Sequence, residues 1–316
     1  MTGQESSRRS TGERYGGDGG VSLLRLATYA SVATALTLIL AKAVAYFMTD
    51  SVSLLSTLLD SLLDAAASIL NLFAVRHALT PADREHRFGH GKAEPLAGLG
   101  QAAFITGSAI FLLFEAGQRL ISPRPLENTE IGIAVMLFSI AATVALVTFQ
   151  RHVIRRTGSV AIKADSLHYV GDLLVNGSVV VALLLEAQLG WPGADALFGI
   201  GIALYIVYTA WQIARISLDM LMDRELPDED RKRIREIALE QPLVLSLHDL
   251  RTRSAGPNVF IQLHLEMDGT LSLFEAHAAA DAVEVELMRA FPGAEVIIHQ
   301  DPAGVDERRD RPGPRA

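Results

Sequence analysis

Four ionisable side chains stand at matching positions in two strongly apolar stretches. Asp60 and Asp64 are four residues apart in SVSLLSTLLDSLLDAAASILNLF, and His168 and Asp172 are four apart in ADSLHYVGDLLVNG. Residues four apart share one face of a helix, so three carboxylates and one imidazole could close a tetrahedral cage around a divalent cation. The alternative is simple polar contacts between helices. A charged group at bilayer depth costs about 2.5–3.5 kcal/mol, so two unused pairs are disfavoured.

A second group lies in the polar connection PADREHRFGHGK at 81–92. Asp83, His86 and His90 are spaced three and four residues apart, so a short helical turn or a folded loop could bring them to one ion. A solvated basic loop is the alternative interpretation. Arg87 stands where the H-E-x-x-H motif of zinc proteases requires its glutamate, so metalloprotease chemistry is disfavoured.

The last third of the chain concentrates histidine. Four of the nine histidines fall between positions 248 and 299, and an amide and a carboxylate follow the last one: His248, His264, His277, His299, Gln300 and Asp301. Their places on predicted strands and a helix could converge on a metal site, although lone surface histidines are usually without function. We expect no role for His77 and His152, which lie at membrane edges.

Two asparagines extend the faces of the helices that carry the first four residues. Asn71 follows Asp64 in one stretch, and Asn176 follows Asp172 in the other. We expect both amides to form interhelical hydrogen bonds rather than to bind metal.

Composition narrows the chemistry further. The chain contains no cysteine, which excludes disulfides, thiol catalysis, Cys₄ zinc sites and iron–sulfur ligation. Metal binding must therefore use His, Asp and Glu, which favours zinc, iron(II) or manganese over copper(I). The net charge of −8 and the absence of a basic stripe argue against nucleic-acid binding. The sequence has no phosphate-binding P-loop and no other sign of an organic cofactor.

The 316 residues are 50% hydrophobic and only 20% charged, which is typical of a membrane protein. A helix of about 20 residues crosses the hydrocarbon core. We predict six such helices, near residues 23–47, 51–76, 95–120, 130–152, 164–188 and 195–220. Lys and Arg concentrate in the connections 76–92 and 151–163, which predicts that both termini are cytoplasmic.

After Arg224 the pattern is that of a soluble domain. It predicts a helix at 227–241, strands in VLSLHDLRTRSAG and NVFIQLHLEMD, a helix at 272–291 and a strand at 294–301. The order αββαβ favours a ferredoxin-like α+β fold. Residues 228–301 hold seven basic and 14 acidic side chains, so this domain should attract cations. We place the transmembrane domain at 21–222 and the cytoplasmic domain at 223–302, between disordered tails at 1–20, which lacks a signal-peptide core, and 303–316.

The motifs together resemble one family. Six spans, LLDSLLD in the second, LHYVGD in the fifth and an αββαβ tail are similar to the cation diffusion facilitators, and most of all to the bacterial ferrous-iron/zinc efflux branch. PADREHRFGHGKAEPLA, TGSAIF, FQRHVIRRT, ADALF, HDLRTRSAG, IQLHLEM and VIIHQDP follow the pattern of that branch. The resemblance covers roughly residues 20–302.

The resemblance implies three metal sites and a homodimer. The transport site would be Asp60, Asp64, His168 and Asp172, and the loop site would be Asp83, His86 and His90. The cytoplasmic domain would dimerise around a binuclear zinc site of His248, His264, His277 and His299, with Asp301 bridging and Gln300 placing a water. Lys92 and Asp223 would form a salt bridge at the dimer, and Leu167 would act as a hydrophobic gate.

We therefore expect no enzyme, but a proton-coupled antiporter in the bacterial cytoplasmic membrane. It would export zinc, and also iron(II), cadmium or manganese, by alternating access around a site near the midplane of the membrane. A membrane metal sensor and a uniporter without proton coupling are the alternatives. An intramembrane metalloenzyme is disfavoured, because no general base is evident beyond the metal ligands.

Overall fold

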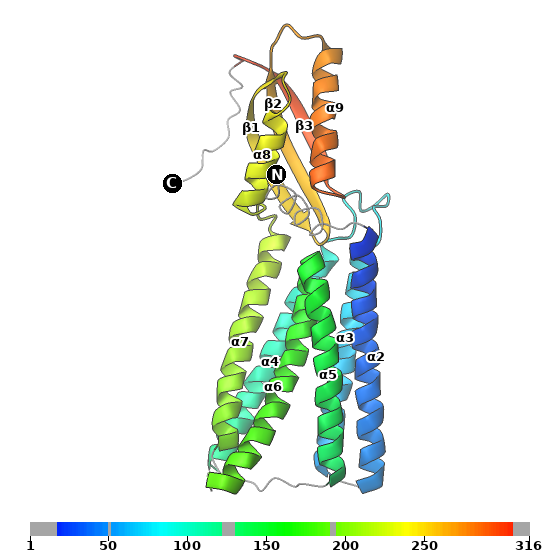
Figure 1. Cartoon of the computed structure of the whole chain (residues 1–316), viewed down its shortest axis with the longest axis vertical. Coiled ribbons are helices and arrows are strands. Elements are labelled where there is room, and N and C mark those ends of the chain that lie inside the picture. Colours follow the sequence, from blue (N-terminus) through cyan, green and yellow to red (C-terminus); the bar gives the residue numbers. More distant parts are fainter. Residues whose placement is uncertain (1–17, 50–51, 122–129, 190–193, 306–316) are drawn as a thin grey trace, which may run out of the picture. The chain divides into compact units, whose positions relative to one another are not determined.

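The structure is a computed structural model that describes residues 18–49, 52–121, 130–189 and 194–305. The chain forms two compact units, one built mainly from residues up to Asp223 and the other from Arg224 onward. Figure 1 labels the helices of the first unit and the sheet and helices of the second.

The first unit is a bundle of six long helices. They are α2 (Asp18–Thr49), α3 (Val52–Ala78), α4 (Ala93–Ile121), α5 (Glu130–Thr157), α6 (Val160–Leu189) and α7 (Ala194–Leu221). Every predicted span is confirmed as a helix, and most extend a few residues further, because polar residues continue them beyond the apolar stretch. Among the described residues, all of these helices except α6 have the length and composition to cross a membrane. In α6, most side chains after Ser178 lie outside the described part.

The predicted tails are only partly described. The helix α2 begins at Asp18, which is slightly earlier than the predicted end of the N-terminal tail at residue 20. The remaining tail residues, 1–17 and 306–316, lie outside the described residues, so their disorder stays a prediction.

Small side chains allow the helices to approach closely. The helix α4 packs mainly against α7, α2 packs against α3 and α5, and α6 contacts α5, α7 and α4. The interior contains many alanines, such as Ala109 of α4 and Ala203 of α7. At Gly98 a Cβ atom would lie 2.6 Å from the Ser217 hydroxyl oxygen, so a larger residue would require side chains between α4 and α7 to shift. Close packing of small residues is typical of membrane helices.

The start of α6 is fixed by three interactions. Gly158, with φ of 65°, makes the left-handed turn that separates α5 from α6. Ser159 Oγ accepts a hydrogen bond from the Ile162 N–H at 3.2 Å, as an N-cap residue does. The buried Glu94 of α4 accepts one from the Val160 N–H at 2.9 Å, which places a carboxylate at the positive end of α6. These contacts set the position of His168, which lies about two turns further along the helix.

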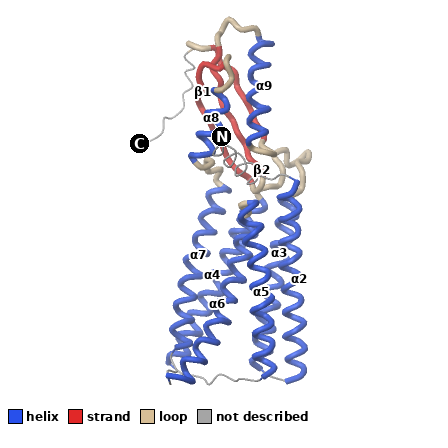
Figure 2. Tube along the Cα trace, in the orientation of Figure 1, coloured by secondary structure: helices blue, strands red, loops and turns tan. Residues whose placement is uncertain are grey.

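The second unit has the predicted αββαβ order. It contains α8 (Asp228–Leu239), β1 (Val244–Ala255), β2 (Asn258–Met267), α9 (Leu273–Ala290) and β3 (Glu295–Pro302), shown in Figure 2. The strand order is β1-β2-β3, and β2 pairs with β3 in parallel. Alternate β2 residues, among them Ile261, Leu263 and Leu265, are buried in the core. The residues between them, including His264, therefore face the opposite side of the sheet.

Candidate metal centres

Helices α3 and α6 bring three of the four predicted cage residues together. His168 Nε2 lies 2.8 Å from Asp64 Oδ1 and 3.9 Å from Asp172 Oδ2. One ligand atom from each of the three residues lies within 4.8 Å of the others. A divalent ion could be held between these atoms after small side-chain movements, because carboxylate oxygen and imidazole nitrogen are common ligands of zinc and iron(II).

The fourth predicted residue, Asp60, lies outside this group. It stands one turn from Asp64 on α3 and is exposed. Side-chain exposure falls from 37% at Asp172 to 20% at Asp64 and 6% at His168. The cluster is therefore accessible from the end of the bundle nearer Asp60 and closed toward the end that carries the loop with Asp83.

Two further residues, Lys42 and Leu167, lie near the cluster. The Lys42 ammonium of α2 donates hydrogen bonds to Ser61 Oγ at 2.6 Å and to the Thr57 carbonyl at 3.1 Å, close to the acidic face of α3. It supplies positive charge beside a group of carboxylates. Leu167 packs against a buried cluster on the closed side of His168, which is formed by Ala102, Val160, Ala164 and Ile213.

A buried carboxylate that we did not single out from the sequence lies one turn before His168. Asp165 is fully buried and accepts hydrogen bonds from Ser31 Oγ at 2.6 Å and from Gln150 Nε2 at 2.7 Å. Ser68 Oγ lies 3.5 Å from its other oxygen and 2.9 Å from the Tyr169 hydroxyl. The network joins α2, α3, α5 and α6. The signal available in the sequence was an aspartate within an apolar span, three residues before a ligand histidine.

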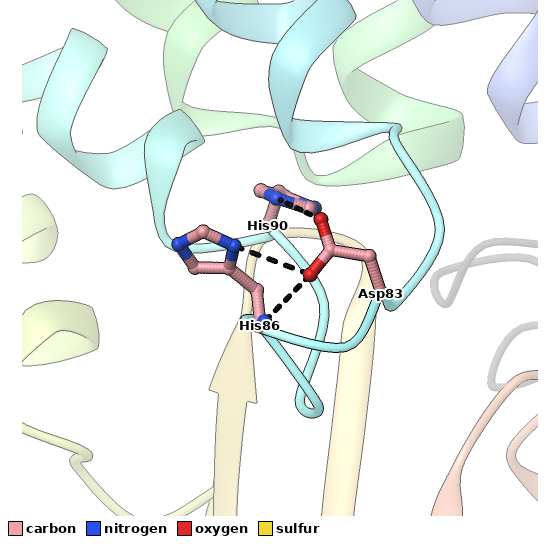
Figure 3. Close-up of side chains that lie close together, drawn as sticks. All are labelled: Asp83, His86 and His90. Atoms are coloured by element: carbon pink, nitrogen blue, oxygen red, sulfur yellow. Dashed lines mark hydrogen bonds and ion pairs between the residues drawn. The ribbon is translucent and has the colours of Figure 1, made fainter.

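The loop between α3 and α4 brings together all three of its predicted ligands. His86 Nδ1 lies 3.4 Å from Asp83 Oδ1, and His90 Nε2 lies 3.5 Å from Asp83 Oδ2. Figure 3 shows the two rings turned toward the same carboxylate. The left-handed Gly89, with φ of 74°, makes the turn that brings His90 back.

Backbone N–H groups of the loop hold the Asp83 carboxylate in place and keep it ionised. Its Oδ1 accepts hydrogen bonds from the His86 N–H at 2.6 Å and the Glu85 N–H at 2.9 Å. These bonds hold the pKa of the Asp83 carboxyl below its usual range, so the group stays ionised in mild acid. The His90 ring is buried, with its Nδ1 3.3 Å from the Thr80 carbonyl oxygen, which leaves Nε2 for a metal ion. The His77 ring, for which we expected no role, lies 4.6 Å from that of His90.

The predicted pair at the end of the bundle is also in contact. Lys92 Nζ lies 3.0 Å from Asp223 Oδ1, and both side chains are partly exposed. Asp223 lies two residues after the end of α7 and has a left-handed backbone conformation, with a φ of 56°. The structure describes a single chain, so the place of this pair in a dimer stays a prediction.

In the second unit, three histidines surround one carboxylate. Asp301, which is buried, lies 2.7 Å from His264 Nδ1, 3.4 Å from His248 Nε2 and 3.0 Å from His299 Nε2. The parallel register pairs His264 with His299, so their side chains share one face of the sheet. Ring centres are 5.0 Å apart for His248 and His264, and 4.6 Å apart for His264 and His299. Two imidazoles on one tetrahedral zinc ion have ring centres about 5 Å apart.

His277 is not brought to this group. It lies on α9, is exposed, and contacts Asp281 of the same helix at 3.6 Å. Gln300 pairs in register with Leu265, and its role with water stays a prediction. Two acidic residues that we did not predict lie beside the histidines: Asp249 is 3.7 Å from His264 Nε2, and Glu266 is 3.3 Å from His248 Nδ1.

Comparison with known proteins identifies a family for both units of the chain. Residues 28–222 match the family described as "Cation efflux transmembrane domain", and residues 226–303 match "Cation efflux protein, cytoplasmic domain". The chain is 52% identical to the cation-efflux pump FieF of Shewanella oneidensis, over 90% of this chain and 95% of that protein. It is 50% identical to the Klebsiella pneumoniae pump of the same name, over 90% and 94%. A solved metal-bound C-terminal domain of the CzcD transporter from Thermotoga maritima is 29% identical, covering 25% of this chain and 93% of that one, with a TM-score of 0.24.

Proposed function

The chain belongs to the cation diffusion facilitator family of cation-efflux transporters, and we propose that it exports zinc or iron(II) in exchange for protons. It is a multi-pass membrane protein with a cytoplasmic C-terminal domain, and its family is one of transporters rather than enzymes. The bacterial inner membrane, with the N-terminus also cytoplasmic, is the location we propose. Cadmium and manganese are further substrates that the same ligands would accept.

The observation that carries the proposal is the 2.8 Å contact between His168 Nε2 and Asp64 Oδ1. Both atoms are potential acceptors, so a hydrogen bond between them requires a proton on one of the two. Metal binding uses the lone pair of His168 Nε2 and the ionised Asp64 carboxylate, so the shared proton must leave this contact when the ion enters. We propose that it leaves the cage rather than moving to His168 Nδ1. The same cluster can therefore carry a cation in one direction and a proton in the other.

Asp60 is proposed as the fourth ligand of this transport site. It is exposed on the accessible side of the cluster, one turn from Asp64. Movement of α3 relative to α6 would bring its carboxylate to the ion and would open the opposite side, as alternating access requires. Leu167, on the closed side of His168, is in a suitable place for the proposed gate.

The other sites are proposed to support transport. The loop site would collect ions at the cytoplasmic surface. In the cytoplasmic domain, His248, His264, His299 and Asp301 would hold zinc, with Asp301 between two ions, and ion binding would offset the repulsion between two acidic domains in a homodimer. His277, which lies apart from the others within one chain, would join the site only after a rearrangement or from a second subunit.

Purified protein in lipid vesicles tests the proposed function. Zinc added outside should enter while protons move the opposite way, as read by a zinc dye and a pH dye trapped inside. Zinc movement with no proton movement at any pH gradient would identify a uniporter. Zinc binding without zinc movement would identify a sensor, and either result would contradict the proposal.

A further inference from the structure

Among the described residues of the helical bundle, three buried amides have polar atoms without hydrogen-bond partners: Asn71, Gln101 and Gln150. Asn71 and Gln101 are considered first. Asn71 of α3 is 2% exposed, and among the described residues neither its Oδ1 nor its Nδ2 has a hydrogen-bond partner. The interhelical hydrogen bond that we expected is therefore wrong. Gln101 of α4 is 7% exposed and donates from Nε2 to the Ala67 carbonyl at 3.3 Å, but its Oε1 is equally unpaired in the described part of the chain. Burying unpaired amide groups opposes folding, so their presence calls for an explanation.

Their position relates them to the transport site. Asn71 is seven residues from Asp64, which places it two turns along the same face of α3, about 10 Å away. The direction is toward Ala78, where α3 ends before the loop that carries Asp83. Gln101 reaches α3 at Ala67, one turn from Asn71 on the same side. The two amides thus lie between the loop site and the cage, on the side where the cage is closed.

The facing helix offers no polar group at this level for a passing ion. From His168, the same face of α6 continues toward its N-terminus with Ala164 and Ala161, both fully buried. Asp165 of α6 already accepts hydrogen bonds from Ser31 and Gln150. Gln150 Oε1 of α5 is also unpaired among the described residues, but its Nε2 is held by Asp165. Asn71 and Gln101 therefore supply the unpaired oxygens on α3 and α4 that a cation could meet between the loop and His168.

We propose that Asn71 and Gln101 form a transient station that holds a divalent cation and its hydration shell between the loop and the cage. This inference rests on the proposed transport function. Neutral amide oxygens suit a station of this kind, because they can replace part of the ion's hydration without the strong attraction of a carboxylate. A conducting path requires binding that is favourable enough to admit the ion and weak enough to release it.

Zinc flux in lipid vesicles and thermal stability in detergent, measured on the same variants of the full chain, test the proposal. In Asn71→Leu, an apolar side chain of similar size replaces the unpaired amide, so the protein should be as stable as wild type or more stable. Its maximal zinc flux should fall at least about tenfold, because the ion loses a polar contact on its way from the loop site to the cage. Equilibrium zinc affinity of the cage should be unchanged, because Asn71 is not a ligand there.

Ser217→Ala is the matched control. The Ser217 hydroxyl is also buried without a hydrogen-bond partner among the described residues, but it lies on α7 beside Gly98 of α4, not on the face of α3 that carries Asp64 and Asn71. Its removal should leave zinc flux unchanged. Gln101→Met provides a second test with a close isostere, and Asn71→Ser, which keeps a polar group, should restore most of the flux.

Three results would overturn the inference. The first is wild-type flux in both Asn71→Leu and Gln101→Met, which would make the amides packing residues. The second is a weakened equilibrium affinity of the cage in Asn71→Leu, which would make Asn71 part of that site. The third is equal loss of flux in Ser217→Ala. Absence of flux in the wild-type protein would instead contradict the proposed function, so the two failures are distinct.

Discussion

The cage in the membrane domain and the histidine cluster in the cytoplasmic domain use the same pair of groups in different settings. His168 and Asp64 are 2.8 Å apart, and His264 and Asp301 are 2.7 Å apart. In the bundle, the pair joins two helices, α3 and α6, whereas in the cytoplasmic domain it joins hydrogen-bonded neighbours, β2 and β3. The sheet register holds the second pair together, but the first pair separates whenever the two helices move apart.

This difference suggests different uses for similar chemistry. A site whose ligands come from two movable helices can be assembled and taken apart in each transport cycle. A site on adjacent strands keeps its geometry and can retain an ion as a structural element. The loop site lies between these cases, because its ligands come from one short segment whose backbone fixes Asp83.

The largest effect is expected from removing the cage. His168→Ala leaves the carboxylates without the imidazole, so zinc flux into vesicles should be lost although the protein still inserts into the membrane. The exposed His152→Ala, at the end of α5, is the matched control and should transport normally. Transport by His168→Ala at the wild-type rate would remove the cage from the mechanism.

The next effect is expected at Asp165. Asp165→Ala would leave Ser31 and Gln150 without their shared acceptor in the centre of the bundle. We expect a loss of about 2–4 kcal/mol in the free energy of unfolding, measured by denaturation in detergent. Asp165→Asn, which keeps one carbonyl acceptor, should lose less. Equal stability of all three proteins would show that the network does not hold the four helices together.

A smaller effect is expected at the loop. The double variant His86→Ala, His90→Ala should raise the apparent KM for zinc while leaving the maximal flux largely intact, because this exposed loop does not cross the membrane. Flux titrated against zinc concentration separates the two quantities. Complete loss of transport in a folded double variant would show that every ion must pass through the loop site.

The smallest effect is expected in the cytoplasmic domain. His264→Ala should reduce the zinc-dependent strengthening of the dimer but leave some transport, since it does not alter the bundle. Sedimentation of the full chain in detergent, with zinc and with a chelator, measures this difference. If zinc strengthens the variant dimer as much as the wild type, the cytoplasmic cluster has no part in assembly.

Local patterns in the sequence predicted most of the fold and the ligand pairs. The period of the helix places Asp60 beside Asp64 and His168 beside Asp172 before any helix is packed. The predicted strands likewise carry His248, His264 and His299 at positions that could converge on one ion. These features depend on a few neighbouring residues, so they can be read directly from the chain.

Features that depend on which helices are neighbours could not be predicted in this way. The partners of Asp165 come from α2 and α5, and Glu94 of α4 bonds the start of α6. Asn71 was expected to find an interhelical partner, yet its amide has none in the described part of the chain. Distant pairing of this kind depends on the packed bundle and leaves no periodic signal in the sequence.

The most direct test of the central claim counts the protons released when zinc binds the cage. Titration calorimetry in buffers of different ionisation enthalpy gives this number for a full-chain variant in which the histidine ligands of the other two sites are all changed to alanine. These are His86, His90, His248, His264 and His299. We predict release of about one proton or more per zinc ion, because we propose that the proton between His168 and Asp64 leaves the cage when zinc binds. Zinc binding to the intact cage without proton release would contradict it.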